Sequence, residues 1–390
     1  MSLISLWKSN PSEIEQMDVQ QLTAVAGKGV LRDGSTKSTE LREYLASVST
    51  ELLGRYLTEC LDSTFDNNGL VLQDIVNELG VRLDCKVQRG LYRGKVNEIG
   101  FDGIWSLPGG HDLVVEVKAT DIYSINLDKL ADYRNSLIRT TQITETSSIL
   151  IVVGRMDTGA LEAQVRGSRH AWDVRLIGAD ALLRLVKIKE SADNKGTIDK
   201  IRSVLKPLEL TKLDFVVELL ATTTEDIQES STPEVDGSEE GKQEKSFTPV
   251  AFNNEVAERV GKALNLDLHK RTRSLYISAD NNISVRALAS KEYVHTHHSG
   301  YWYAFHPYYN DALAEYKKSY VAFGCGSPKN ILLFQLRDFS KLVGNMNTTE
   351  KGDRMYWHVH ISKDDAGAYK LIFKSGIPSK DVTNSLIKEK

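Results

Sequence analysis

Residues 100–118 read GFDGIWSLPGGHDLVVEVK, two apolar segments that flank a Pro-Gly-Gly turn. This pattern is typical of a β-hairpin. Because side chains alternate between the two faces of a strand, Glu116 and Lys118 share one face of the second segment. The turn brings Asp102 of the first segment against this pair. The stretch therefore predicts two carboxylates and one ammonium group that converge at the edge of a sheet.

Such a set of side chains is typical of a divalent-metal site that acts on phosphodiester bonds. Carboxylate oxygens bind hard cations such as Mg²⁺, and a cation and a lysine stabilise negative charge on the phosphate and the attacking water. The same three residue types also meet by chance in exposed hairpins. However, the run LVVEVK is strongly apolar, and ionised groups at the end of a buried run usually have a partner or a metal.

The hairpin resembles the active-site motif of the PD-(D/E)XK restriction-endonuclease-like nucleases. Asp102 matches the first acid of that motif, Glu116 the second acid and Lys118 the lysine. The proline that usually precedes the first acid is absent, because Phe101 stands there. The resemblance implies that Asp102, Glu116 and the Val117 carbonyl hold Mg²⁺ or Mn²⁺. It also implies that Lys118 orients or helps to deprotonate the attacking water.

The order of the predicted elements over residues 45–190 is also similar to that family. Two helices come first, and three strands follow them. A helix over residues 125–138 and a buried strand over residues 147–154 complete the succession. The resemblance implies an α/β fold with a restriction-endonuclease-like α-β-β-β-α-β core.

Two more residues are auxiliary candidates for this site. Glu98 shares a strand face with Asp102 by alternation, so it is placed to contact a metal-bound group. Gln73 lies on the helix before the first strand, where many members of the family carry a glutamate. Glu98 is equally well explained as an exposed loop acid, and Gln73 as a surface residue.

The composition is that of a globular protein. The chain has 390 residues, of which 41% are apolar and 26% are charged, and this length is sufficient for two or three domains. Its apolar runs are shorter than the ~20 residues of a membrane helix, and the first residues lack a signal-peptide pattern. Its three cysteines form no CxxC pair. These features predict a cytoplasmic protein without a membrane segment.

An acidic segment divides the chain. Residues 222–246 contain eight acids and two lysines, with almost no large apolar side chain. Such a segment cannot bury enough surface to offset its ordering entropy, so we predict a disordered linker. The remaining parts are then a helical N-terminal arm over 1–44, the nuclease domain over 45–221 and a β-rich (α+β) domain over 247–390.

The C-terminal domain has an unusual composition. Residues 247–390 hold 19 of the 30 aromatic residues, and 20 Lys and Arg residues against 14 Asp and Glu. Its strand-like segments predict a half-open barrel or a curved sheet. Basic residues neutralise phosphates and aromatic rings stack on bases, so we predict nucleic-acid recognition; a solvated surface and an aromatic core are the alternatives. The candidate contacts are Lys270, Arg271, Arg273, Trp302 and Tyr303.

Histidines form two further groups in this domain. Each HxH pair places its imidazoles on one strand face. Four such imidazoles are suitable ligands for zinc. The alternative explanation of the same pattern is a ladder of surface histidines. The residues are His295, His297, His298, His358 and His360.

Together these patterns predict a Mg²⁺-dependent DNA endonuclease with a C-terminal recognition domain. The family resemblance implies restriction or another anti-phage defence, and a homodimer that cuts both strands. Two alternatives remain open. One is a nuclease effector that is switched on by a nucleotide or protein signal sensed by the C-terminal domain. The other is a non-catalytic DNA-binding protein.

Overall fold

The chain is mixed α/β and divides into two compact units. The first unit comprises Met1–Lys189 and Ile198–Leu219, and the second comprises Glu190–Thr197 and Leu220–Lys390. None of the helices in the described part of the chain is long and apolar enough to cross a membrane. The computed structural model describes residues 2–27, 31–93, 99–118, 124–154, 158–207, 214–228, 249–294, 298–351 and 354–387.

Helices form the N-terminal part of the first unit. They are α1 (Leu3–Ser9), α2 (Pro11–Gln16), α3 (Val19–Val25), α4 (Thr36–Ser47), α5 (Thr50–Asp62) and α6 (Asn68–Arg82). Side-chain caps fix several of their starts. Asp18 and Gln21 form a reciprocal capping box at α3, and Ser49 caps α5. Residues 2–27 and 31–44, the described part of the predicted arm, share one apolar core with α5 and α6.

One five-stranded sheet lies in the first unit. Its strands are β1 (Lys86–Arg89), β2 (Gly103–Leu107), β3 (His111–Lys118), β4 (Ser147–Val153) and β5 (Val174–Gly178), in this order. β2 and β3 form the predicted hairpin. Gly109 and Gly110 take positive φ angles of 96° and 86° in its turn, which favour glycine. β3 pairs antiparallel with β2 and parallel with β4, so it lies in the middle of the sheet.

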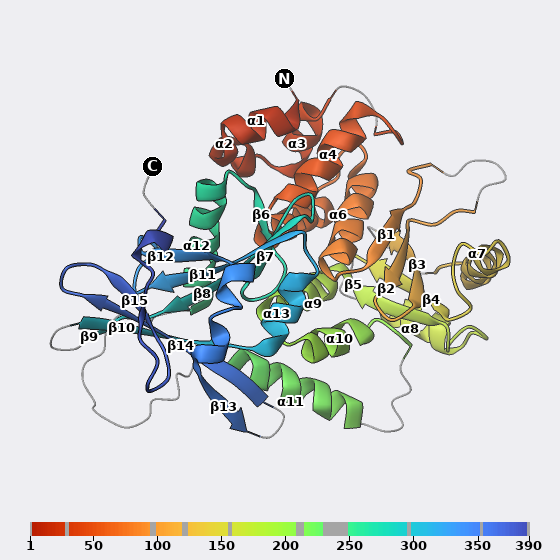
Figure 1. Ribbon diagram of the computed structural model, residues 1–390. Coiled ribbons are helices and arrows are strands. Elements are labelled where there is room, and N and C mark those ends of the chain that lie inside the picture. Colours follow the sequence, from red (N-terminus) through yellow and green to blue (C-terminus); the bar gives the residue numbers. More distant parts are fainter. Residues whose placement is uncertain are drawn as a thin grey trace. The chain divides into compact units, whose positions relative to one another are not determined.

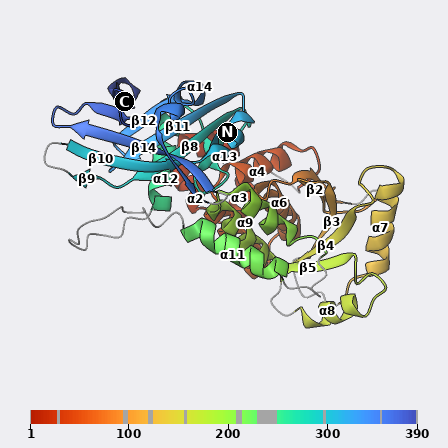
Figure 2. The ribbon, with the colours of Figure 1, turned by 60° about the horizontal axis from the view of Figure 1, so that its bottom comes forward.

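Helices cover both faces of this sheet (Figure 1). α6 packs against one face, where a Cβ atom on Gly80 would lie 2.6 Å from the Trp105 ring. α7 (Leu127–Arg139) packs against the other face, and Figure 2 shows the two helices on opposite sides of the strands. Val115 belongs to the α6 face and Val114 to the α7 face. Glu116 and Lys118 therefore lie on the α7 face, as strand alternation predicts.

A helix extends into the segment that the sequence analysis predicted as a linker. Four helices follow in the chain: α8 (Gly159–Arg166), α9 (Ala179–Ser191), α10 (Lys195–Ser203) and α11 (Asp214–Gln228). α11 includes residues 222–228, so the prediction of a disordered linker is wrong for these seven residues. The helix begins at Asp214, whose negative charge is favourable at a helix N-terminus, and an apolar run follows it. Once a helix has started, each added residue gains a hydrogen bond at little cost, so the helix extends through residues 222–228. Residues 229–246 lie outside the described part.

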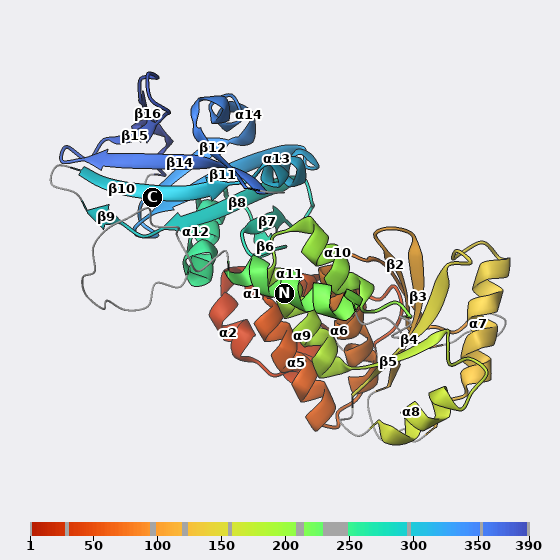
Figure 3. The same ribbon diagram turned by 90° about the horizontal axis from the view of Figure 1, so that it is seen from below.

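Two sheets and one long helix form most of the second unit. The helix, α12 (Pro249–Leu264), packs on the outer face of the sheet β12-β11-β8-β7-β6 (Figure 3). The other sheet has the order β16-β15-β14-β10-β9, with β13 paired to β14. After α12, the described elements of the second unit are β6 (Leu268–Lys270), β7 (Leu275–Ser278), β8 (Ile283–Ser290), β9 (Tyr293–Val294), β10 (His298–Phe305), α13 (Pro307–Ala314), β11 (Lys318–Cys325), β12 (Ile331–Gln335), α14 (Leu336–Phe339), β13 (Asn347–Lys351), β14 (Arg354–Asp364), β15 (Tyr369–Ile372) and β16 (Lys380–Asp381), with 3₁₀ turns at Val343–Asn345 and Thr383–Ser385.

The core of the second unit lies between these two sheets. Tyr301, Phe323 and Val359 are among the buried side chains that meet there. The half-open barrel or single curved sheet predicted from the sequence is therefore wrong. Alternate apolar residues of two separate sheets pack face to face, which encloses a core without closing one sheet on itself.

Candidate active site

The structure brings the three predicted catalytic side chains together. Asp102 directly precedes β2 and donates its N–H to the Val115 carbonyl of β3 at 3.0 Å, and its carboxylate lies close enough to Glu116 and Lys118 to feel both charges. Asp102 Oδ2 accepts a hydrogen bond from the Val117 N–H at 2.7 Å, and Lys118 donates to the Glu116 carboxylate. Two acids and one lysine thus meet where β3 ends, on the face covered by α7.

The site is shielded from water and carries an excess of negative charge. The side chains of Glu116 and Lys118 are 17% and 26% exposed. Burial, followed by the neighbouring Glu116 carboxylate, raises the pKa of Asp102 to about 6, although the Val117 N–H and Lys118 act in the opposite direction. A single ammonium group does not balance two carboxylates. A cation at this point would stabilise both in their ionised forms.

The donor set fits a hard divalent cation. In a strand the N–H and C=O of one residue point to the same side, so the Val117 carbonyl points toward Asp102 as its N–H does. Asp102, Glu116 and this carbonyl would supply oxygen ligands of the kind that Mg²⁺ and Mn²⁺ bind. Among the described residues, no three or more His, Cys, Asp or Glu side chains gather into a metal-binding group. Glu98, the auxiliary candidate, lies outside the described residues.

Helix α7 adds two residues that the sequence analysis missed. Lys129 lies over the ring of Tyr133, with Nζ 5.3 Å from the ring centroid. A hydrogen bond with Tyr133 and, to a smaller extent, the charge of Glu116 raise the pKa of Lys129. A Cβ atom on Gly100 would lie 3.2 Å from the Tyr133 hydroxyl. Only the fold places this helix beside the site, so no local sequence pattern indicates either residue.

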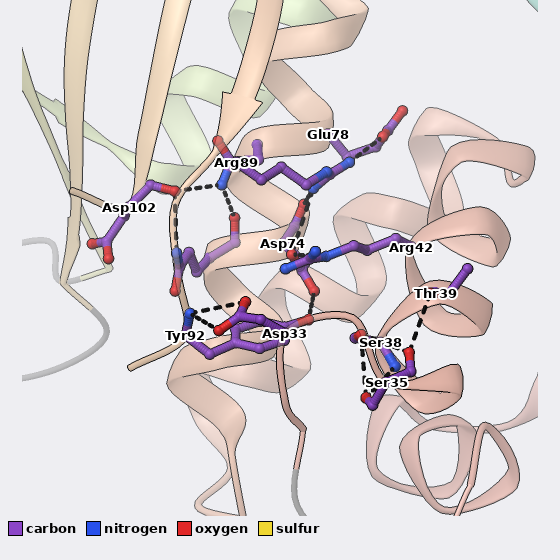
Figure 4. Close-up of polar contacts among 12 residues, drawn as sticks. Asp33, Ser35, Ser38, Thr39, Arg42, Asp74, Glu78, Arg89, Tyr92 and Asp102 are labelled. Carbon is purple, nitrogen blue, oxygen red and sulfur yellow. Dashed lines mark hydrogen bonds and ion pairs between the residues drawn. The ribbon is translucent and has the colours of Figure 1, made fainter. Parts of the chain in front are cut away.

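The interpretation of Gln73 as a surface residue is wrong. It is buried on α6, and its Nε2 donates a hydrogen bond to the main-chain carbonyl of Asp102 at 3.1 Å. Figure 4 shows this carbonyl directed toward α6, while the Asp102 carboxylate points away from that helix. Gln73 therefore contacts the backbone of the site.

A second polar cluster lies on α6 beside the site (Figure 4). The buried Asp74 carboxylate accepts a hydrogen bond from Arg42 Nε at 2.8 Å and another from the Tyr92 hydroxyl. Arg89, at the end of β1, donates to the Asp74 carbonyl at 3.0 Å. The Tyr92 N–H in turn donates to the Asp33 carboxylate at 3.1 Å. The cluster thus joins the N-terminal helices to the segment that follows β1.

The basic cluster of the second unit divides into accessible and buried residues. Lys270 and Arg271 are half-buried at the end of β6. Arg273 is buried, and its Nε lies 3.3 Å from the Asp193 carboxylate. Phosphate contact by Arg273 is therefore a wrong prediction, because its charge balances a buried acid of the same unit.

Trp302 and Tyr303 point to opposite faces of β10. Tyr303 lies in the core, where its hydroxyl donates to the Gly324 carbonyl at 2.9 Å, so its predicted contact with nucleic acid is wrong. Trp302 lies half-buried on the face turned away from that core, and its Nε1 donates to His358 Nδ1 at 3.1 Å. Its ring also contacts Tyr356 edge-on. Trp302 therefore remains a candidate for recognition.

Two of the described histidines, His358 and His360, form an imidazole pair. The rings of His358 and His360 stack with centroids 5.9 Å apart, and His358 Nε2 is 2.6 Å from the Thr349 hydroxyl. His298 lies at the opposite end of β10, across from Asp364. In this part of the chain the histidines therefore do not meet as a zinc site; His295 and His297 lie outside the described residues.

No family model matches the chain, and no curated protein matches it.

Proposed function

We propose that this protein is a metal-dependent endonuclease that hydrolyses phosphodiester bonds of DNA with Mg²⁺ or Mn²⁺. The observation that carries the proposal is the convergence of Asp102, Glu116 and Lys118 at the end of the central strand β3. The chain order α6-β1-β2-β3-α7-β4 supports the assignment of these elements to a restriction-endonuclease-like core.

The roles of the residues follow from their positions. When bound, the cation would supply positive charge to the scissile phosphate. Asp102 and Glu116 supply their carboxylate oxygens as metal ligands on one face of the sheet. Lys118, on the same face, offers N–H donors to a phosphate oxygen or to the attacking water. Lys129 of α7 adds positive charge from the exposed side, and the partial burial of Glu116 and Lys118 strengthens their interactions relative to bulk water.

The direct test is incubation of the full chain with plasmid DNA, phage DNA that carries modified bases, and RNA. We expect cleavage of DNA in Mg²⁺ or Mn²⁺, and none in EDTA or with Asp102→Ala. Cleavage of RNA alone would replace DNA as the substrate. If the wild-type chain binds DNA but cuts nothing in either metal, the alternative of a non-catalytic DNA-binding protein holds.

We also propose that the enzyme acts in the cytoplasm in restriction or anti-phage defence. The support for this part is the resemblance of the hairpin motif. Cutting both strands of a duplex takes two such sites, so a homodimer on DNA is expected. Sedimentation of Asp102→Ala with a duplex in the presence of Ca²⁺ would show whether two chains bind together.

For the second unit we propose nucleic-acid recognition through Trp302 and the neighbouring aromatic face of β10 and β14. Trp302→Ala is expected to weaken binding by about 1–3 kcal/mol, since each base that stacks on an aromatic ring contributes this much. Lys270→Ala and Arg271→Ala are expected to weaken binding of all sequences and to reduce the salt dependence by about one ion each. Fluorescence anisotropy with labelled single strands and duplexes, in an Asp102→Asn background, measures both effects.

Trp172→Ala is the matched control, because this tryptophan lies in the first unit and is 71% exposed. It is expected to leave affinity unchanged. Unchanged affinity of Trp302→Ala, Lys270→Ala and Arg271→Ala for every nucleic acid would remove the recognition role. The alternative of a unit that senses a nucleotide or protein signal would then explain these side chains.

A further inference from the structure

Three donors meet at one carbonyl oxygen beside the candidate site. The main-chain oxygen of Asp102 accepts hydrogen bonds from Asn77 Nδ2 at 2.9 Å, from Gly90 N at 3.0 Å and from Gln73 Nε2 at 3.1 Å. A carbonyl oxygen has two lone pairs, and most main-chain carbonyls accept fewer than three hydrogen bonds. Two of the three donors are side-chain amides that lie one turn apart on α6, so the carbonyl is held by the helix as well as by the sheet.

Every polar atom of the Asn77 amide has a partner, which fixes its orientation. Its Nδ2 donates both to Asp102 and to the Gln73 carbonyl, the latter at 3.0 Å. Its Oδ1 accepts from Trp105 Nε1 at 2.9 Å. Asn77 is fully buried. Exchange of its O and N atoms would leave Trp105 Nε1 facing an NH₂ group, so this arrangement is the one that satisfies all donors.

Two glycines make this close approach possible. A Cβ atom on Gly103 would lie 2.3 Å from Asn77 Oδ1, and one on Gly90 would lie 1.8 Å from the Phe101 carbonyl. Neither distance is compatible with a side chain, and the second involves backbone that cannot move aside. The chain around Asp102 is thus held between α6 and β1 without room for adjustment.

From this geometry we infer that Gln73 and Asn77 are positioning residues for the Asp102 carboxylate. The inference rests on the proposed nuclease function. With its carbonyl fixed on the α6 side, Asp102 projects its carboxylate to the α7 face, where Oδ2 reaches the Val117 N–H at 2.7 Å. The Gln73 amide thus donates a hydrogen bond to the backbone of Asp102. In this role Gln73 positions a metal ligand and is not itself a metal ligand.

The first test measures the binding of Mn²⁺ to the full chain by calorimetry. Gln73→Met keeps the length of the side chain and removes the donor; Gln73→Glu places a carboxylate against the Asp102 carbonyl. Both variants are expected to bind Mn²⁺ about 10-fold to 100-fold more weakly, as is typical when a residue that orients a metal ligand is lost. Tighter binding by Gln73→Glu would overturn the inference, because it would make residue 73 a ligand.

The second test needs no metal. The Val117 N–H donates to the Asp102 carboxylate, so its rate of hydrogen exchange reports whether that carboxylate stays in place. In Gln73→Glu we expect exchange at Val117 to accelerate by about 10-fold. Exchange at Gly154, whose N–H donates to the Lys118 carbonyl at 2.8 Å, should not change. Equal exchange at Val117 in wild type and variant would refute positioning even if the protein binds no Mn²⁺ at all.

Leu72→Ala is the control variant for a loss of stability without a loss of the Gln73 hydrogen bond. Leu72 is buried on the same helix, next to Gln73 in sequence. This variant is expected to lower the melting temperature at least as much as Gln73→Met, while Mn²⁺ affinity and Val117 exchange stay as in wild type. If Leu72→Ala weakens Mn²⁺ binding as strongly as Gln73→Met does, general destabilisation explains the effect and the inference fails.

Discussion

Asp102→Asn, Glu116→Gln and Lys118→Met should each reduce DNA cleavage by at least about 10³-fold, because each removes charge that acts on the transition state. All three substitutions preserve side-chain size, so the loss reports chemistry rather than packing. Single-turnover cleavage with saturating Mg²⁺ measures the effect. Asp128→Asn is the matched control: its carboxylate is exposed and binds Arg169 and His170, so cleavage should remain as in wild type.

The same Asp102→Asn variant is expected to be more stable than wild type in the absence of metal. The folded-state pKa of Asp102 is about 6, above the usual unfolded value of about 4. The folded protein therefore binds more protons than the unfolded chain between these pH values, and its stability falls as pH rises through this interval. At neutral pH the ionised carboxylate costs about 2–3 kcal/mol, at 1.36 kcal/mol for each unit of pKa.

Urea unfolding at two pH values tests this cost. Metal-free wild type should lose stability between about pH 4 and pH 6, while Asp102→Asn should lose less over the same interval. Cleavage by Asp102→Asn at the wild-type rate would disprove the catalytic assignment. A less stable Asp102→Asn would instead show that the Val117 hydrogen bond outweighs the burial of charge.

The parts of the site that the sequence predicts are those that depend on local geometry. A hairpin with a Gly-Gly turn and an alternating strand places Asp102, Glu116 and Lys118 on one face by period alone. The faces of Val114 and Val115 follow from the same alternation. No tertiary information is needed for these residues, because their neighbours in space are also near neighbours in the chain.

The parts that the sequence does not predict depend on contacts between distant segments. Gln73 reaches Asp102 from a helix 29 residues earlier, and Lys129 approaches Glu116 only through the packing of α7 on the sheet. Burial likewise decides the role of charged and aromatic residues in the second unit. Arg273 and Tyr303 have the same appearance in the sequence as surface residues, but partners elsewhere in the fold enclose them.

The largest stability effect is expected at Asp193, in the segment Glu190–Thr197 of the second unit. Its side chain is 1% exposed. The carboxylate lies 3.0 Å from Arg286 Nη1, and it accepts hydrogen bonds from the Thr272 hydroxyl at 2.5 Å and the Ser274 hydroxyl at 2.7 Å. Burial alone would raise the pKa of Asp193, but the two arginines and the hydroxyl donors hold it below its usual value.

Asp193→Ala is therefore expected to destabilise the second unit by about 3–5 kcal/mol, because it leaves the guanidinium groups of Arg273 and Arg286 buried without their counter-charge. The wild-type contribution is present above the usual pKa of aspartate, about 4, and is lost as pH falls through the lower folded-state value. Hydrogen exchange of peptides from β7 and β8, followed by mass spectrometry of the full chain, measures the effect in this unit alone.

A double-mutant cycle separates the ion pair from general damage. If the buried charges act together, Arg286→Met should recover part of the loss in the Asp193→Ala background, because the second change removes an unpaired buried cation. Asp338→Asn is the control, since this acid of the same unit is exposed and pairs only with Lys341 at 2.8 Å among the ion pairs of the described residues. Additive losses in the cycle, or exchange in Asp193→Ala equal to that in wild type, would show that Asp193 does not hold this segment in the unit. Glu190–Thr197 is flanked in sequence by residues of the first unit on both sides, and the bonds of the Asp193 carboxylate to Thr272, Ser274 and Arg286 join these eight residues to the second.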